Sequence, residues 1–255
     1  MSSPELQSLS ENPYGLSAIW QQGDSVILSV ALLLLIMSIS SWTIIAIRTW
    51  HLMTLRKQME AVKSFWHTQN FQEAQQLLGS NTPANPFRYL SEQGHSALIH
   101  HQTHQTHQQD LHGKLPLTDW VTDSLSSAID ESAECLQRGL TLLASVGSTA
   151  PFIGLFGTVW GIYHALVNIG ASGQASIDQI AGPVGEALVM TAFGLAVAIP
   201  AVLAYNALVR ANKSVLGKLK RFAHQLHAYF LTGVHFSGSQ TEPMQAKISQ
   251  LKEVK

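Results

Sequence analysis

Glu186 is the residue whose type and setting point most directly to chemistry. Between Arg138 and Arg210 the sequence has no Lys or Arg, and its carboxylates there are Asp178 and Glu186. An ionisable group deep in a membrane costs about 2.5–3.5 kcal/mol on insertion scales, so it is rarely kept without a task. Asp178 lies in the first turn of a predicted helix, where a carboxylate suits the helix dipole. Glu186 has no such explanation and predicts a proton relay or gate.

Two alternatives for these polar residues stay open. A protonated Glu186 could instead hydrogen-bond a neighbouring subunit and fix assembly, because an apolar medium disfavours the charged form. Thr191 follows Glu186 by five residues, about 140° around a helix, so the two face different directions unless the helix is distorted or borders a wide cavity. Thr158 and Thr191 could each bond a carbonyl of their own helix, as hydroxyls in helices often do.

A second group of residues with possible chemistry is a run of histidines among Gln-Thr-His repeats: His95, His100, His101, His104, His107 and His112. Histidines three and four apart share a helix face and can hold zinc or nickel, which gives a weak metal-site hypothesis at His100, His101, His104 and His107. The alternative is a solvated low-complexity insertion whose charge responds to pH.

Composition excludes several classes of function. Charged residues make up 12% of the chain, the net charge is −1, and Cys135 is the one cysteine. These values give no sign of nucleic-acid binding, of an intramolecular disulfide or of a thiolate metal cluster. Nucleophile motifs, phosphate loops and dinucleotide fingerprints are also absent from the sequence, so we expect neither an enzyme nor a bound cofactor.

The apolar residues are concentrated in three blocks, each long enough to cross a bilayer. We predict an all-α integral membrane protein of three long transmembrane helices with cytoplasmic helical extensions and a loop. The predicted segments are an N-terminal periplasmic stretch 1–24, spans 25–47, 138–168 and 176–209, a cytoplasmic loop 48–137 that is His-rich over 95–112, a periplasmic turn 169–175, and a cytoplasmic helix and tail 210–255.

Charge sets the predicted orientation. All 15 Lys and Arg residues lie within 48–138 or from 210 onward. The positive-inside rule then places the N-terminus and the turn outside and the C-terminus in the cytoplasm. The cationic collar after the third span, from Arg210 to Arg221, could also contact anionic lipid headgroups.

Within the loop, apolar residues at helical spacing predict a helix over 48–78 that continues the first span. The Asn- and Pro-rich stretch 81–86 breaks it. We expect a shorter helix over 87–101 and a last one over 118–137 that runs on into the second span.

The second span carries small residues three and four apart, a spacing that lets helices approach closely in lipid. Pro151 loosens the backbone in the same span, and Gly185 keeps the third span thin beside Glu186. The predicted helix-packing residues are therefore Gly147, Gly154, Gly157, Gly161, Pro151 and Gly185.

Two motifs carry a resemblance to a known family. The sequences PFIGLFGTVWGI at 151–162 and GEALVMTAFGLAVAIPA at 185–201 resemble the proton-channel family of ExbB, TolQ and MotA, with MotA the more distant. One departure is AGPVGE at 181–186, where the family often has APGIAE. The extra glycine puts the local backbone geometry in question, and leaves the identity of the acid unchanged.

The resemblance implies a multi-pass protein of the Gram-negative inner membrane that forms a homo-oligomeric, pentameric ring around an ExbD-like single-span partner. Such a ring uses the proton-motive force, with protons as coupling ion, to energise a TonB-like protein for import of siderophores and vitamin B12. The family's pore-lining positions fall on Thr158, Glu186 and Thr191. A TolQ-type role in envelope integrity and a passive membrane scaffold are the alternatives, whereas three spans without an inverted repeat argue against a secondary transporter.

Overall fold

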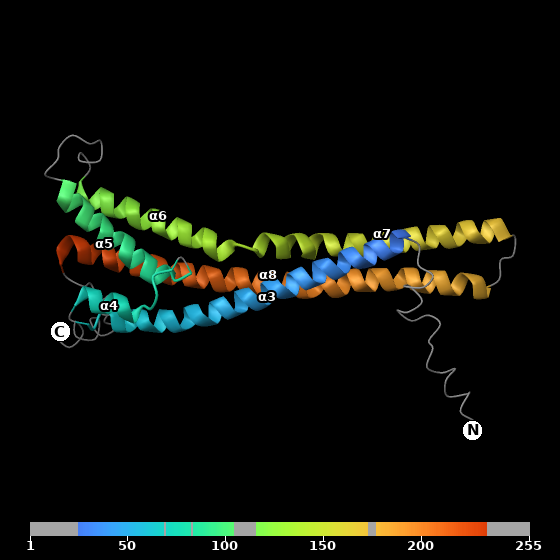
Figure 1. Cartoon of the computed structure of the whole chain (residues 1–255), viewed down its shortest axis with the longest axis horizontal. Coiled ribbons are helices and arrows are strands. Elements are labelled where there is room, and N and C mark those ends of the chain that lie inside the picture. The colour runs from blue at the N-terminus through green and yellow to red at the C-terminus, as the bar shows by residue number, and fades with distance from the viewer. Residues whose placement is uncertain (1–24, 69, 83, 105–115, 173–176, 234–255) are drawn as a thin grey trace, which may run out of the picture. The chain divides into compact units, whose positions relative to one another are not determined.

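Every regular secondary-structure element in the described part of the chain is a helix. The computed structural model describes residues 25–68, 70–82, 84–104, 116–172 and 177–233 (Figure 1). The helices are α3 (Ser25–Phe65), α4 (Phe71–Leu77), α5 (Pro86–His104), α6 (Leu117–Gln137), α7 (Leu140–Ser172) and α8 (Ile177–Thr232). Three helical stretches, Ser25–Phe65, Leu117–Ala171 and Ala187–Thr232, are long and apolar enough to cross a membrane. The predicted all-α class with three candidate spans is therefore confirmed, while the orientation and the ring stay predictions.

The predicted helix over 48–78 is wrong in its extent, because α3 ends at Phe65. The backbone N–H of His67 donates to the carbonyl of Ser64 at 3.0 Å, and the Thr68 hydroxyl donates to the carbonyl of Phe65 at 2.6 Å. These bonds satisfy carbonyls that the end of a helix leaves open. The chain then turns and continues as the separate helix α4.

The run-on from the third loop helix into the second span is also wrong, because α6 stops at Gln137 and α7 starts at Leu140. Gly139 between them has φ +80°, a left-handed conformation that glycine adopts at little cost. The side-chain amide of Asn212 donates to the carbonyl of Leu136 at 2.7 Å and so caps the end of α6.

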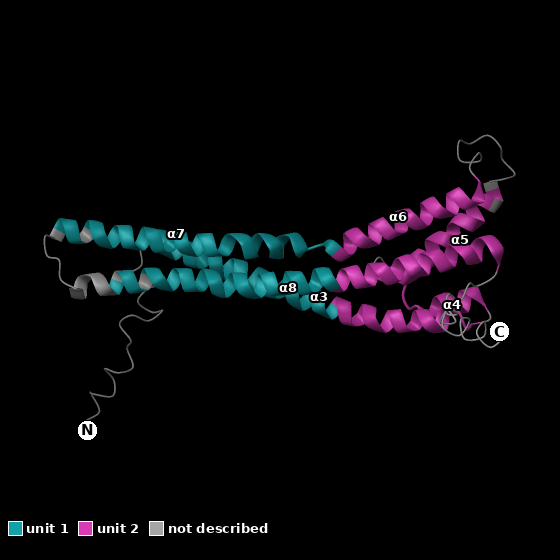
Figure 2. Ribbon diagram, turned by 180° about the vertical axis from the view of Figure 1, so that it is seen from behind, with its two compact units in different colours: residues 1–50, 137–210 teal, residues 51–136, 211–255 magenta. Residues whose placement is uncertain are grey.

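The described chain divides into two compact units (Figure 2). Unit 1 comprises residues 1–50 and 137–210, and unit 2 comprises 51–136 and 211–255. In unit 1, α7 runs antiparallel to α8, and contacts of Ile27 and Val30 bring α3 against α7. Large apolar side chains such as Phe152, Leu188 and Leu203 are exposed on this unit, as expected of helices that face lipid.

Unit 2 has a core like that of a soluble helical protein. Phe65, Phe87, Leu90, Phe222 and Leu226 are buried in one apolar cluster. The rings of Phe65 and Phe222 meet edge-to-face with centroids 5.2 Å apart, a favoured aromatic geometry. The cluster brings α3, α5 and α8 together, so this unit is held by aromatic burial.

Two hydrogen-bonded pairs fix α5 in unit 2. Asn85 caps its start, since its Oδ1 accepts the backbone N–H of Arg88 at 3.3 Å while its Nδ2 donates to the carbonyl of Leu78 at 2.6 Å. The Tyr89 hydroxyl donates to the Glu131 carboxylate on α6. This hydrogen bond, with burial and the Glu131 charge, raises the pKa of Tyr89 above its usual value.

Helix boundaries in the spans differ from the predictions by a few residues. The first span and its extension are one helix of 41 residues, and the third span continues without a break into the predicted C-terminal helix as one helix of 56 residues. Helix α7 extends to Ser172, into the predicted turn. Residues 1–24, 105–115, 173–176 and 234–255 lie outside the described residues. They include the predicted N-terminal segment and the last parts of the predicted turn 169–175, the His-rich stretch 95–112 and the C-terminal segment 210–255.

Replacing Phe222 by Ala tests the aromatic core of unit 2. Because Phe222 is 1% exposed and touches several rings, the change should lower the free energy of unfolding by about 3–5 kcal/mol. Thermal unfolding of the full chain in detergent, followed by circular dichroism, measures this. Lys220→Ala, two residues away and exposed, is the control and should unfold like the parent; equal behaviour of both variants would contradict the assignment.

Candidate functional site: the α7–α8 seam

The α7–α8 seam is the contact between these two helices in unit 1, and glycines make it close. A Cβ atom on Gly154 would lie 2.6 Å from the carbonyl oxygen of Met190, and one on Gly194 would lie 2.6 Å from the carbonyl oxygen of Ala150. Real Cβ atoms do not approach a carbonyl this closely, so the two backbones touch where side chains would otherwise separate them.

The other small residues of α7 extend the seam along the helix. A Cβ on Gly147 would meet Val202 at 2.5 Å, and one on Gly161 would meet Ala187 at 2.9 Å. Gly157 lies against two helices at once, because its Cβ position is 3.1 Å from Met190 of α8 and 3.1 Å from Val30 of α3. The predicted stripe of small residues therefore lies along the helix contacts.

Pro151 and Gly185 have a different place. Pro151 is half-buried inside α7 and has no N–H, so the carbonyl of Gly147 lacks its usual partner within the helix. A Cβ on Gly185 would meet nothing within 4 Å in the described structure. A packing role for Gly185 thus stays a prediction, without a neighbour among the described residues to support it.

Thr158 and Thr191 meet inside the seam. Thr158 is 5% exposed, and its hydroxyl donates to the carbonyl of Leu155 at 2.7 Å. The Thr191 hydroxyl, half-buried on α8, points at the Thr158 oxygen from 3.5 Å, the outer limit of such a contact. Thr158 thus bonds its own helix, one of the two alternatives left by the sequence, and also contacts Thr191 of the neighbouring helix. The pore-lining role of the two threonines stays a prediction.

Glu186 belongs to the α8 helix, immediately before Ala187, which is fully buried against Gly161. Its side chain lies outside the described residues, as does that of Asp178. Along the helix Glu186 precedes Thr191 by about 7.5 Å of rise. The structure thus brings the two threonines together and puts the backbone of the acid one to two turns away on α8.

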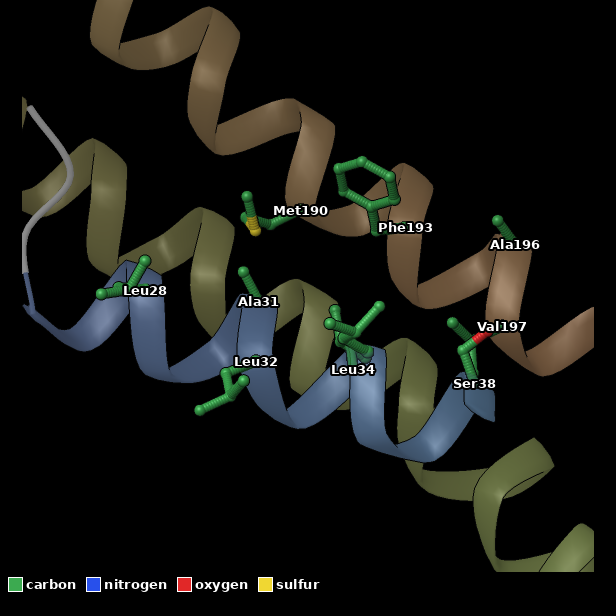
Figure 3. A pocket seen from close by; sticks show the side chains of 10 residues that line it. Leu28, Ala31, Leu32, Leu34, Ser38, Met190, Phe193, Ala196 and Val197 are labelled. Atoms are coloured by element: carbon green, nitrogen blue, oxygen red, sulfur yellow. The ribbon is translucent and has the colours of Figure 1, made fainter. Parts of the chain in front are cut away.

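The groove between α3 and α8 is a feature that the sequence did not reveal (Figure 3). It has a volume of about 360 Å³, and its lining includes Leu34 and Ser38 of α3 with Met190, Phe193 and Val197 of α8. The three α8 residues follow position 186 by four, seven and eleven residues, one helix stripe. The hydrophobic pattern of the sequence cannot show which face of α8 lines this groove, because every face of an intramembrane helix is apolar.

The metal hypothesis gains no support from the part of the loop that is described. His100 is exposed and stacks on Trp120 with ring centroids 5.7 Å apart. The side chain of His104 and all of His107 lie outside the described residues. Among the residues with described positions, no three His, Cys, Asp or Glu side chains gather as a metal site would require. The hypothesis stays a prediction for the remainder of the loop.

Comparison with known proteins gives the family. The model of the MotA/TolQ/ExbB proton channel family matches residues 95–221. A biopolymer transport protein ExbB from Xanthomonas campestris pv. campestris is 44% identical over 213 residues, which cover 83% of this chain and 84% of the relative. The chain belongs to the MotA/TolQ/ExbB proton channel family. It is accordingly a multi-pass protein of the Gram-negative inner membrane, from a family of transport subunits and not of enzymes.

Two further relatives show how the likeness divides within the proton channel family. ExbB of Neisseria meningitidis is 42% identical over 219 residues, 85% of this chain and 97% of the relative. The Tol-Pal system protein TolQ of Pseudomonas aeruginosa is 31% identical over 214 residues, 83% of this chain and 90% of the relative. Both branches match most of the chain, and these ExbB relatives match it at higher identity.

Gly194→Ala tests the backbone contact of the seam. Its new methyl group would meet the Ala150 carbonyl, so we expect a loss of roughly 1–3 kcal/mol in stability, as for other overpacked sites. Gly185→Ala is the matched control on the same helix, where space is open and the change should be neutral or slightly stabilising. Unfolding by SDS titration of the purified protein compares the two; a Gly194→Ala variant as stable as Gly185→Ala would show that the helices do not touch there.

Replacing Thr158 and Thr191 by Val, singly and together, tests their contact. A hydrogen bond between membrane helices couples by about 0.6 kcal/mol on average, with a maximum near 1.7 kcal/mol. We expect a coupling in that range from the same unfolding titration. Thr149→Val is the control, because Thr149 is exposed and its hydroxyl donates to the carbonyl of Ser145, with no other partner among the described residues; it should show no coupling to Thr191→Val. A coupling of zero between Thr158→Val and Thr191→Val would show that the two hydroxyls do not interact.

Proposed function

We propose that this chain is the ring-forming subunit of a proton-driven motor in the inner membrane. With an ExbD-like single-span partner inside the ring, the motor energises a TonB-like protein for import of siderophores or vitamin B12 through outer-membrane receptors. The ring is a homo-oligomer, a pentamer by the family resemblance, and protons are its coupling ion, with no resident cofactor or enzymatic reaction.

The observation that carries the proposal is the setting of the three polar residues. Thr158 of α7 and Thr191 of α8 place two hydroxyls within 3.5 Å in an otherwise apolar seam, and Glu186 precedes Thr191 on α8 by five residues. Intramembrane ionisable groups mark ion pathways more often than structural sites. Two hydroxyls, with a carboxylic acid residue one to two turns away on α8, are the kinds of donor and acceptor that a proton path needs in the absence of bulk water.

The energy available suits such a motor. Moving one elementary charge through 100 mV is worth about 2.3 kcal/mol, so several protons supply enough to shift or rotate a guest helix past packing barriers of a few kcal/mol. In this mechanism protonation of an acid on the partner's helix, with Glu186 as relay or gate, drives each step. The glycine seam keeps α7 and α8 together while the partner moves.

The 42–44% identity to ExbB of Xanthomonas campestris and Neisseria meningitidis over most of the chain, against 31% to TolQ of Pseudomonas aeruginosa, favours the import role over the envelope role. The TolQ-type function is the second candidate, since a TolQ relative still matches 83% of the chain. A passive scaffold is the candidate from another class. It predicts full partner activity when Thr158, Glu186 and Thr191 are all made apolar, which the motor does not.

Glu186→Ala, introduced into the chromosomal gene, tests the function. We expect loss of growth on siderophore-bound iron as the sole iron source, because the relay group is gone, while co-purification with the ExbD-like partner persists. Glu73→Ala, which removes an exposed carboxylate on α4, is the matched control and should grow normally. Wild-type growth of the Glu186→Ala strain would refute the relay role.

Deletion of the gene separates the two branches. Failure to use siderophore-bound iron with normal resistance to bile salts would indicate the ExbB-type role. Sensitivity to bile salts with normal iron use would indicate the TolQ-type role and overturn the import assignment.

A further inference from the structure

Helix α6 presents a continuous acidic stripe. Asp119, Asp123, Asp130 and Glu134 are all exposed and, at 100° per residue, project within about 60° of one another. The helix contains no Lys, Arg or His. None of the four carboxylates has an ion-pair partner among the described residues. One face of α6 in unit 2 therefore carries negative charge that no cation among the described residues pairs with.

A basic groove lies in the same unit between α3 and α8. It has a volume of about 430 Å³, and its lining includes Arg56, Glu60 and Lys63 of α3 and Ser214 and Lys218 of α8. Three cations against one carboxylate leave it positive. In the described structure none of the three cations has a carboxylate within ion-pair distance, Glu60 included.

The stripe and the groove cannot meet within one chain. In unit 2, α6 and the end of α3 lie on opposite edges with α8 between them (Figure 2). Two complementary surfaces on opposite sides of one subunit are the requirement for a heterologous contact that closes into a ring.

The two surfaces also lie at the same level. Leu136 and Thr122 of α6 bond Asn212 and His227 of α8, so α6 descends from 136 to 122 while α8 advances from 212 to 227. Counting along both helices at equal rise puts Asp130 level with position 218 and Glu134 level with position 214.

Helix α3 is aligned with α8 by a second bond. The indole N–H of Trp66 donates to Oε1 of Gln225 at 3.2 Å, and the two helices run in the same direction. Counting back ten residues on each puts Arg56 level with position 215. In a ring whose axis runs along these helices, rotation about the axis preserves height, so a neighbour's Asp130 would come level with Lys218 and its Glu134 with Arg56.

Lipid headgroups are a poorer match for this groove. Arg56 and Lys218 each follow the last residue of a predicted span by nine positions, about 14 Å of helix. The headgroup layer extends only about 5–8 Å beyond the hydrocarbon on each side.

We propose that the acidic stripe of α6 in one copy docks into the basic α3–α8 groove of the next copy, pairing Asp130 with Lys218 and Glu134 with Arg56. This contact rests on the homo-oligomeric ring of the proposed function and names the surface that closes it on the cytoplasmic side. The charged pairs would fix how neighbouring subunits align along their helices, in addition to the apolar contacts in the membrane.

Cross-linking between two tagged chains tests the contact in the membrane. In a Cys135→Ser background, one chain carries Asp130→Cys and the other Lys218→Cys, each with its own affinity tag. A short bis-maleimide added to membranes should give a dimer that carries both tags. Asp119→Cys in place of Asp130→Cys is the matched control, because it lies on the same stripe about 16 Å further along; it should give little product.

Charge exchange provides a measurement without cysteines. Lys218→Glu and Asp130→Lys should each weaken association of the purified oligomer roughly two- to fivefold, and the double variant should regain the loss. Higher salt should weaken the parent oligomer.

The outcomes separate the interface from the ring. If both tags co-purify, any of three results would overturn this contact and leave the ring intact. These are no cross-link between positions 130 and 218, equal cross-linking from position 119, and a double charge variant that associates no better than the single variants. Failure of the two tags to co-purify at all would overturn the homo-oligomer in the proposed function, and this contact with it.

Discussion

The backbone-to-backbone contact of α7 and α8 is the constraint on which the rest of the membrane unit depends. In lipid, apolar surface gains nothing by leaving its surroundings, so helices associate through close packing and a few hydrogen bonds. Gly154 and Gly194 allow each helix to touch a carbonyl of the other. The same closeness brings the Thr158 and Thr191 hydroxyls together. The close approach of the two helices thus accounts for both the glycine contacts and the polar contact.

The two units rely on different physical effects. In unit 2 the large rings of Phe65, Phe87 and Phe222 are buried from water, which stabilises a compact core by the hydrophobic effect. In unit 1 many large apolar side chains are exposed, and glycines lie where α7 meets α8, although large residues such as Leu143 and Met190 are buried there too. Helices α3 and α8 take part in both units, so each of them changes its pattern of buried residues partway along its length.

The sequence was informative where a signal is local. Apolar length predicted the spans, and small residues at helical spacing predicted the stripe that lies along the seam. It failed at Gly139, because one glycine in a helical pattern is as consistent with a packed helix as with a break. It failed again after Phe65, where the end of α3 coincides with burial of that ring by Phe222, a contact across more than 150 positions.

The site was only partly predictable for a similar reason. Periodicity on α7 could identify its small-residue face, but the meeting of Thr158 with Thr191 depends on the offset between two antiparallel helices. That offset is set by which glycine faces which carbonyl. The α3–α8 groove depends on where a third helix packs, for which a uniformly apolar sequence carries no signal.

The break at Gly139 has a consequence for changes in chain length. An inserted residue turns everything beyond it in a continuous helix by 100°. Within α3 or α8 such an insertion would swing Arg56 or Lys218 out of their groove, whereas at positions 138–139 the interruption can absorb it. Natural variation in length should therefore collect at this junction, leaving the rotational phase of α6 free to evolve separately from that of α7.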